Sequence, residues 1–229
     1  MKMLGLIGGT SWISTIDYYR LINEQVNQRL GGSQYAQCII YSFNYGEIVA
    51  LSATQDWDGI LEKVVSACAC LREGGAEGLV LCANTMHIIA DRVQDRVGLP
   101  VIHIAEATAG GVKRARLRSV ALLGTRFTME MDFFRDRLAR HQIQTTIPAE
   151  ADREFIHTSI FGELGKGILR PETKARYLEI IASLVARGAE GVILGCTEIP
   201  MLVKQEDCPV PVFDTTALHA AAAVDFALG

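Results

Sequence analysis

Two stretches of the 229-residue chain repeat one pattern, LREGGAEGLVLCANT at Leu71–Thr85 and LVARGAEGVILGCTE at Leu184–Glu198. In each, a helical pattern ends at a Gly-Ala-Glu-Gly turn, an apolar strand follows, and small polar residues come after the strand. Fully apolar strands are typical of parallel sheets that are buried on both faces. The repeat, at an offset of 113 residues, therefore predicts an internal duplication of an α/β unit.

The rest of the chain alternates strand-like and helix-like segments in the same style. The expected strands are 3–7, 38–42, 79–82, 101–104, 119–123 and 192–194, and the expected helices lie around 13–26, 57–73, 129–140 and 171–187. Two shorter echoes occur in the same order, LIG at 6–8 with LLG at 122–124 and PVI at 100–102 with PVF at 211–213.

These patterns predict an α/β fold of two similar lobes, with parallel sheets flanked by helices and a pseudo-twofold axis between the lobes. We expect residues 1–98 plus 209–229 to form the first lobe and residues 99–208 the second. Ligands of open α/β sheets bind beyond the carboxyl ends of the strands. The active site is therefore expected in the cleft between the lobes.

Composition excludes several classes of protein. The net charge is −4, which gives no electrostatic reason to expect a nucleic-acid partner. No apolar run is long enough for a membrane span, no export signal opens the sequence, and the six cysteines do not resemble a disulfide framework. We therefore expect a cytoplasmic protein. Neither the spacing of a dinucleotide-binding glycine motif nor that of a zinc site occurs, so no cofactor and no metal are expected.

The residues after the two repeated strands carry the candidate chemistry. Cys196 follows a strand and precedes a helix, where backbone N–H groups and the helix dipole are expected to lower the thiol pKa towards neutrality. The offset of 113 pairs Cys196 with Ala83, whereas Cys82 lies one residue earlier, as the last residue of an apolar strand. A shift of one residue along a strand turns a side chain to the opposite face.

The chain resembles the aspartate/glutamate racemase family over essentially its whole length. The resemblance is carried by GLIGGTSWIST at 5–15, CANTMH at 82–87, ALLGTRFTM at 121–129, GELGKG at 162–167 and GCTEIP at 195–200. It implies a homodimer with a small-molecule substrate, and inversion of an amino-acid α-carbon without a cofactor. In the family, one thiol removes the α-proton while a second thiol, on the opposite face, donates a proton.

The resemblance also implies roles for individual residues. Cys196 matches the family's second cysteine, while Ala83 stands where the family has its first. The opposite-face partner is then Cys82, His87 or an ordered water. His103 also lies beside a strand end, where a structural role is expected. The positions that match substrate-binding residues of the family are Trp12, Thr15, Asn84, Thr85, Thr125, Lys166, Thr197 and Glu198. Residues 48–56 lack the arginine that often clamps a distal carboxylate, so the side chain of the substrate stays open.

Three functions remain open from the sequence. The first is an amino-acid racemase of the aspartate/glutamate type. The second is a one-base decarboxylase or isomerase of the same superfamily, which suits the small Ala83. The third is a non-catalytic carboxylate-binding protein that has lost one proton-transfer group.

Overall fold

A computed structural model describes residues 1–229, and it places the two copies of the repeat in two different units. The first unit consists of residues 1–103 and 219–229, and the second of residues 104–218. These boundaries differ from the expected 98/99 and 208/209 for a physical reason. Val101 pairs with Leu79 in the first sheet, whereas Val212–Asp214 pairs with a strand of the second sheet.

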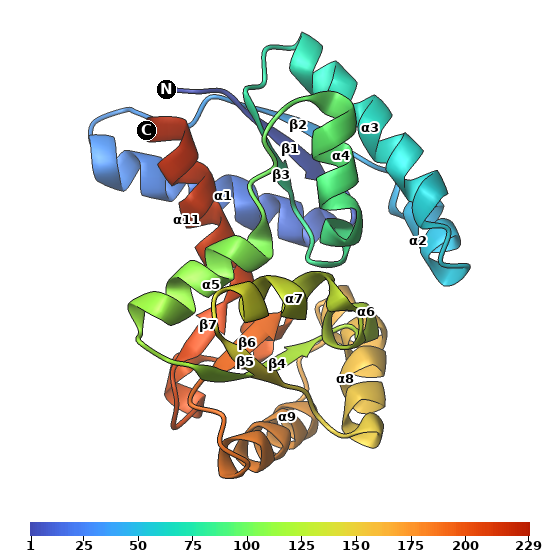
Figure 1. The fold of residues 1–229 in the computed structure, drawn as a ribbon, viewed down its shortest axis with the longest axis vertical. Coiled ribbons are helices and arrows are strands. Elements are labelled where there is room, and N and C mark those ends of the chain that lie inside the picture. Colours follow the sequence, from blue (N-terminus) through green and yellow to red (C-terminus); the bar gives the residue numbers. More distant parts are fainter. The chain divides into compact units, whose positions relative to one another are not determined.

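The first unit contains a sheet of three parallel strands in the order β2-β1-β3 (Figure 1). Its strands are β1 (Leu4–Gly8), β2 (Cys38–Ser42) and β3 (Gly78–Leu81). Its helices are α1 (Trp12–Leu30), α2 (Tyr45–Ala53), α3 (Trp57–Glu73), the 3₁₀ helix η1 (Thr85–Ile89), α4 (Ala90–Val97) and α11 (Thr215–Leu228, of which residues 219–228 belong to this unit).

Helices cover both faces of this first sheet. Leu4, Leu6 and Val80 pack with α1 and α11, while Leu79 and Leu81 pack with α3 and α4 on the other face. Because side chains alternate along a strand, the near-continuous apolar sequence of β3 fills both layers.

The second unit contains four parallel strands in the order β5-β4-β6-β7 (Figure 1). Its strands are β4 (Ser119–Gly124), β5 (Gln144–Thr146), β6 (Val192–Gly195) and β7 (Val212–Asp214). Its helices are α5 (Ile104–Arg114), α6 (Arg126–Glu130), α7 (Asp132–Arg140), α8 (Glu150–Gly162), η2 (Leu164–Lys166), α9 (Pro171–Ala186), α10 (Ile199–Leu202) and η3 (Gln205–Asp207). Helices α8 and α9 contribute to the apolar cluster on one face of the sheet, and α5 and α7 to the cluster on the other.

The duplication extends to the strand register. Leu6 is the partner of Val80 in the first sheet, and the echoing pair in the second sheet is Leu122 with Ile193. The proline-containing echo also recurs, because the N–H of Leu79 donates to Pro100 O and the N–H of Val192 donates to Pro211 O, both at 2.9 Å. The repeat seen in the sequence is therefore a repeat of backbone hydrogen bonding.

The Gly-Ala-Glu-Gly turns adopt the same conformation in both units. Gly75 and Gly188 have φ of 97° and 99°, a region that residues with a Cβ rarely adopt. The glutamate of each turn accepts a hydrogen bond from the backbone just before the central strand. Glu77 Oε1 accepts from the N–H of Met3 and Glu190 Oε2 from that of Ser119, both at 3.0 Å.

The structure corrects three details of the expected secondary structure. The helix expected over 129–140 is interrupted at Met131, whose backbone is extended (φ −80°, ψ 152°). The strand expected over 101–104 shrinks to the single bridge at Val101, because Ile104 already begins α5. Strands β5 and β7, each three residues long, were not expected from the sequence. None of the helices combines the length and the hydropathy needed to cross a bilayer.

Replacement of Gly188 by alanine tests the shared turn. A Cβ at Gly188 would meet no atom within 4 Å, so the whole effect comes from the positive φ. We expect Gly188→Ala to lower the free energy of unfolding by about 1–2 kcal/mol. Gly162→Ala is the matched control, because that site in α8 is also open but no positive φ is recorded there. Equal effects of the two substitutions on urea unfolding would contradict this account.

Candidate functional site

The candidate site in the second unit lies at the carboxyl ends of two neighbouring strands. Gly124 of β4 and Gly195 of β6 are register partners, so the residues that follow them, Thr125 and Cys196, lie at adjacent strand ends. Thr125 caps α6, since its side-chain oxygen accepts a hydrogen bond from the N–H of Thr128 at 3.3 Å. The sheet thus brings the predicted site residues Thr125 and Cys196 to adjacent strand ends.

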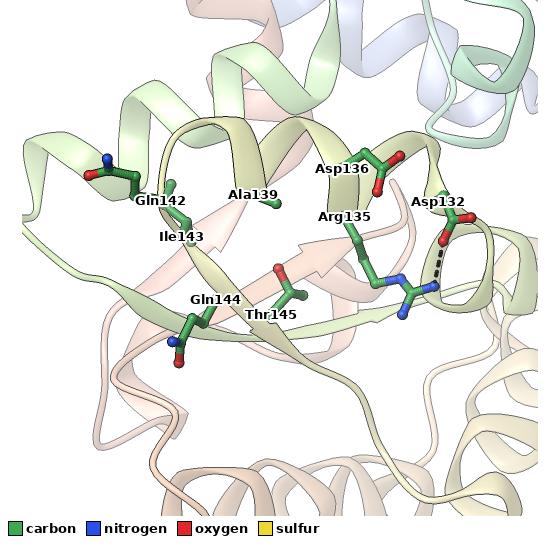
Figure 2. Close-up of a pocket in the computed structure, with 8 residues that line it drawn as sticks. All are labelled: Asp132, Arg135, Asp136, Ala139, Gln142, Ile143, Gln144 and Thr145. Atoms are coloured by element: carbon green, nitrogen blue, oxygen red, sulfur yellow. Dashed lines mark hydrogen bonds and ion pairs between the residues drawn. The ribbon is translucent and has the colours of Figure 1, made fainter.

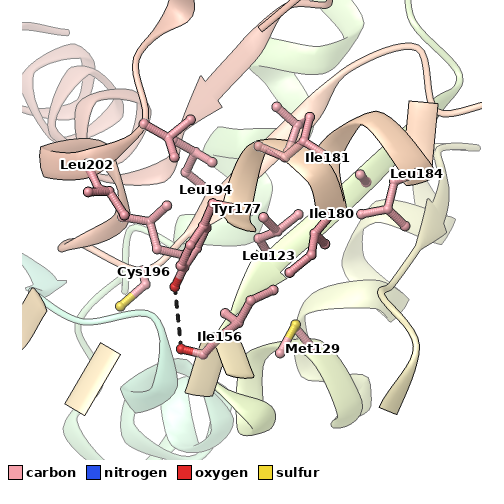
Figure 3. Close-up of a cluster of buried hydrophobic side chains, with 14 of the residues drawn as sticks. Leu123, Met129, Ile156, Tyr177, Ile180, Ile181, Leu184, Leu194, Cys196 and Leu202 are labelled. Carbon is pink, nitrogen blue, oxygen red and sulfur yellow. Dashed lines mark hydrogen bonds between the residues drawn. The ribbon is translucent and has the colours of Figure 1, made fainter. Parts of the chain in front are cut away.

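Cys196 is the residue at which an apolar cluster meets the polar strand end. Its side chain is 7% exposed and contacts the cluster that contains Leu194, Ile199 and Tyr177. Figure 3 shows the sulfur at the margin of this cluster, directed away from the labelled apolar side chains. The thiol donates to Glu198 Oε2 at 2.9 Å, and the backbone N–H groups of Glu198 and Ile199 donate to the sulfur. The sulfur is therefore held by polar partners within a buried environment.

The direction of the pKa shift at Cys196 corrects the expectation from the sequence. The expected N–H groups are present and favour the thiolate, but two stronger effects oppose them. Burial, followed by the negative charge and the hydrogen bond of Glu198, raises the pKa of the Cys196 thiol well above its usual value. The resting sulfur is therefore a thiol at neutral pH, with a carboxylate in contact to receive its proton.

Glu198 and Thr197 are joined to the thiol in one small network. The hydroxyl of Thr197 donates to Glu198 Oε2 at 2.6 Å, the same oxygen that accepts from Cys196. Glu198 itself is 6% exposed. We expected Glu198 to bind substrate, but its carboxylate is already engaged by these two neighbours. Its geometry suits a proton acceptor for the thiol better than a ligand-binding group.

Lys166, predicted to meet an acidic substrate side chain, ends the short helix η2 and is exposed. Gly167 follows with φ 73° and closes the turn. Leu164, at the start of η2, is fully buried in the same apolar cluster as Cys196. The fold therefore anchors the lysine loop to the core that also carries the thiol.

In the first unit, the two residues at the end of β3 face opposite layers. Cys82 is fully buried in the cluster beneath α1 and α11, where its thiol lies 3.7 Å from Val80 O. Burial raises the pKa of the Cys82 thiol far above its usual value. Ala83 instead packs with the cluster of Leu79 and Leu81. Ala83 is thus the positional equivalent of Cys196, and the assignment of Cys82 to proton transfer is not supported by this geometry.

The two other predicted binding residues, Trp12 and Thr15, lie in the first turn of α1, just after β1. Trp12, the first residue of α1, is 68% exposed. The hydroxyl of Thr15, by contrast, accepts from the N–H of Gly9 and donates to Ser11 O, both at 2.9 Å. Because both capacities are used locally, Thr15 stabilises the connection between β1 and α1 and is not a good candidate for binding substrate. Ser14 donates to Cys82 O at 3.2 Å and so links the start of α1 to the end of β3.

Asn84 and Thr85 follow Ala83 and lead into η1, with Asn84 4% exposed. Two residues further on, His87 is 2% exposed, and its Nδ1 lies 3.0 Å from Ala83 O. A carbonyl oxygen only accepts, so this nitrogen carries the proton. The structure therefore groups Ala83, Asn84, Thr85 and His87 at one strand end.

A buried group of histidines lies behind this strand end. The sequence singled out His87 and His103, whereas His219 and the contacts among the three rings were not expected. The His87 ring meets those of His103 and His219 at centroid distances of 4.8 and 5.2 Å, in edge-to-face contacts. His219 donates from Nε2 to Ile102 O at 2.6 Å and accepts the hydroxyl of Tyr18 at Nδ1, at 2.7 Å. The one signal for His219 in the sequence is a lone polar ring in the alanine-rich helix α11.

One hollow in the second unit is unrelated to the strand ends. It has a volume of about 600 Å³ and lies between α7 and the beginning of β5 (Figure 2). Arg135 on its wall is occupied by Asp132 and by the carbonyl of Glu130, each at 2.9 Å. Because β5 begins at Gln144, the hollow lies towards the amino ends of the strands and is not the candidate site.

Comparisons with known proteins place this arrangement in a class and then in a family. Two doubly covered parallel sheets with polar strand ends define an α/β fold of the racemase type, and the model of the Asp/Glu/hydantoin racemase family matches residues 7–223. The chain belongs to that family. It is 28% identical over 173 residues to glutamate racemase of Roseiflexus sp. RS-1, an alignment that covers 72% of this chain and 60% of that protein. It is 19% identical to the broad specificity amino-acid racemase RacX of Bacillus subtilis, covering 97% and 96% of the two chains.

Solved structures show the same fold over the whole chain. A protein from Yersinia pestis, proposed to be an Asp/Glu racemase, superposes with a TM-score of 0.95 at 47% identity, and 100% of both chains is covered. PH1733 of Pyrococcus horikoshii OT3, an aspartate racemase homologue, gives a TM-score of 0.88 at 34% identity with the same complete coverage.

The reactivity of Cys196 provides a test of its neighbour. We expect Glu198→Gln to remove the opposing charge, lower the thiol pKa and speed alkylation of Cys196 by iodoacetamide at pH 7.5, by about tenfold. Mass spectrometry of the peptide that carries Cys196 measures the rate. Glu190→Gln is the control, because that glutamate belongs to the distant turn before β6. Unchanged or slower alkylation in Glu198→Gln would show that the carboxylate does not set the thiol pKa.

The buried His219 predicts a specific loss of stability in acid. Burial, with a smaller contribution from His87, lowers the pKa of His219 to about 3. The unfolded chain binds a proton at this residue below its ordinary value of about 6.5, whereas the folded chain does not. The contribution of neutral His219 to the free energy of unfolding is therefore fully present above pH 6.5, and it is lost progressively as the pH falls towards 3.

When the pH falls from 7.5 to 5.0, this protonation of the unfolded chain at His219 should lower the free energy of unfolding by about 2 kcal/mol. His219→Gln cannot titrate, so its loss over the same interval should be smaller by that amount. Urea unfolding at the two pH values measures the difference. Parallel pH dependences in the wild type and the variant would contradict the neutral, buried state of His219.

Proposed function

We propose that the protein is an amino-acid racemase that moves a proton at the α-carbon of an aspartate- or glutamate-type acid, using the Cys196 thiol and no cofactor. The observation that carries the proposal is the buried Cys196 thiol, hydrogen-bonded to Glu198 Oε2 at 2.9 Å, at a strand end. Membership of the racemase family supports the reaction class. Of the three functions left open by the sequence, we therefore prefer the amino-acid racemase.

The raised pKa of Cys196 requires a defined order of proton movements. The thiol first passes its proton to the Glu198 carboxylate, which lies in contact with it. The resulting thiolate removes the α-proton of the substrate and becomes a thiol again, and the electron pair of the broken C–H bond stays on the substrate as a carbanion. Return of a proton to the opposite face completes inversion. Glu198 then releases its proton to solvent, and solvent restores the proton that the opposite-face donor gave up.

The carbanion is too basic to form without electrostatic help. Asn84, Thr85 and Thr197 match family positions that hold the α-carboxylate, and Thr125 matches a threonine of the loop in the second unit. All four follow the carboxyl end of a strand. Lys166 is a cation suited to a distal carboxylate of the substrate, and Trp12 is exposed at the start of α1. The proposal assigns these side chains to the binding of one substrate.

The opposite face of the substrate has no thiol in this proposal. Ala83 stands at the position equivalent to Cys196, and Cys82 points into an apolar layer. The proton on that face comes from an ordered water or from His87, which adjoins Ala83 O. Proton exchange by Cys196 should therefore be faster than complete inversion.

The test is α-proton exchange in heavy water. We expect the wild type to replace the α-proton of L- or D-aspartate or glutamate by deuterium, with slower appearance of the opposite enantiomer. Cys196→Ala should lower the exchange rate by roughly 10²–10⁴-fold, because a positioned acid–base group contributes about that much. Proton NMR follows the exchange and chiral chromatography the inversion.

Cys208→Ala is the matched control, since Cys208 is a partly buried cysteine of the same unit outside the strand ends. It should exchange like the wild type. Three outcomes would overturn the proposal. These are binding of acids without exchange over a broad panel of amino acids, release of carbon dioxide from a substituted malonate as the only turnover, and full exchange by Cys196→Ala.

A further inference from the structure

We propose that His87 is a positioning residue, which fixes the Ala83–Thr85 turn through its Nδ1–H and is itself held from behind by His103 and His219. The inference rests on the proposed function, because that turn carries Asn84 and Thr85. It concerns a hydrogen bond of the His87 ring and a contact among three rings that the sequence did not predict.

The first step is the contact between the ring and the turn. His87 Nδ1 lies 3.0 Å from Ala83 O, and the backbone N–H of His87 donates to Asn84 O, also at 3.0 Å. One residue therefore satisfies two successive carbonyls of the turn. Ser14 donates to the preceding carbonyl, that of Cys82, at 3.2 Å. The end of β3 is thus fixed by side chains at a point where strand pairing has stopped.

The second step is the fixing of the ring. His219 uses both ring nitrogens, one towards Ile102 O at 2.6 Å and one towards the Tyr18 hydroxyl at 2.7 Å. It is fully buried, and its ring lies edge-to-face with that of His87. His103 contacts the His87 ring from another direction. His103 is the last residue before the chain leaves the first unit, and His219 is the first after it returns. The cluster therefore joins both crossing points to the strand end.

The second unit shows why the first needs such a residue. There, the turn after β6 is fixed from within, because Cys196 Sγ contacts the N–H groups of Glu198 and Ile199 as well as the Glu198 carboxylate. Ala83 has only a methyl group at the equivalent position. The repeat pairs His87 with Pro200, which has no ring N–H to donate. His87 thus supplies to the first turn a constraint that the thiol supplies to the second.

Three substitutions at position 87 distinguish the positioning role from an effect of side-chain volume and from acid–base chemistry. An asparagine carries its N–H donor where histidine has Nδ1, a glutamine reaches to the place of Nε2, and alanine carries neither. We expect amide hydrogen exchange of residues 84–87, measured without ligand, to rise about tenfold in His87→Ala and His87→Gln. His87→Asn should stay within about twofold of the wild type. The KM for L-aspartate should follow the same order.

The outcomes are distinguishable from those of the proposed function, because amide exchange needs no turnover. If His87→Asn protects residues 84–87 and the other two variants do not, the positioning role stands even if the wild type racemises nothing. Equal exchange in all four proteins overturns it. The proposal is also overturned if amide exchange in His87→Asn is as fast as in His87→Ala while all variants have similar melting temperatures. Tyr18→Phe, which removes the donor to His219, should raise the same amide exchange by about threefold.

Discussion

The alternation of side chains at the ends of β3 and β6 decides that Cys82 and Cys196 do not occupy equivalent positions in the two units. Residues two apart share a face, so Ala83 continues the face of Leu79 and Leu81, and Cys196 continues the face of Val192 and Leu194. Cys82 falls on the other face and is enclosed by helices. One thiol is therefore available at a strand end, and the molecule is asymmetric at the position where its two halves correspond.

The surroundings of Cys196 then set the form in which that thiol is available. A partly polar, buried position beside a carboxylate keeps the proton on sulfur, although two backbone N–H groups favour its release. Such a pair is suited to a reaction in which the thiolate exists only briefly. The carboxylate that opposes ionisation at rest is also the nearest acceptor for the proton, so Glu198 has both effects.

Most of the architecture could be predicted from the sequence. The repeat at 71–85 and 184–198 shows where each strand lies, which of its residues share a face, and where the turns have their glycines. The register makes Val80 of β3 and Ile193 of β6 equivalent, and the same offset sets Ala83 against Cys196. Short strands such as β5 contain too few residues for a periodic apolar pattern to be recognised in the sequence. The predicted direction of the Cys196 pKa shift was wrong. Backbone N–H donors can be inferred from a sequence motif, whereas burial and the orientation of Glu198 cannot. His87 and His103 were placed beside strand ends, but their contacts with each other and with His219 could not be predicted, because the three residues come from separate segments that meet only in the fold.

The central claim is that one sulfur, that of Cys196, serves the α-carbon of the bound acid. A crystal structure of the protein with bound aspartate measures this directly. The account predicts Cys196 Sγ within about 4 Å of the α-carbon on one face, with no sulfur near the other face. A second sulfur at similar distance on the opposite face, or an α-carbon remote from Cys196, would contradict it.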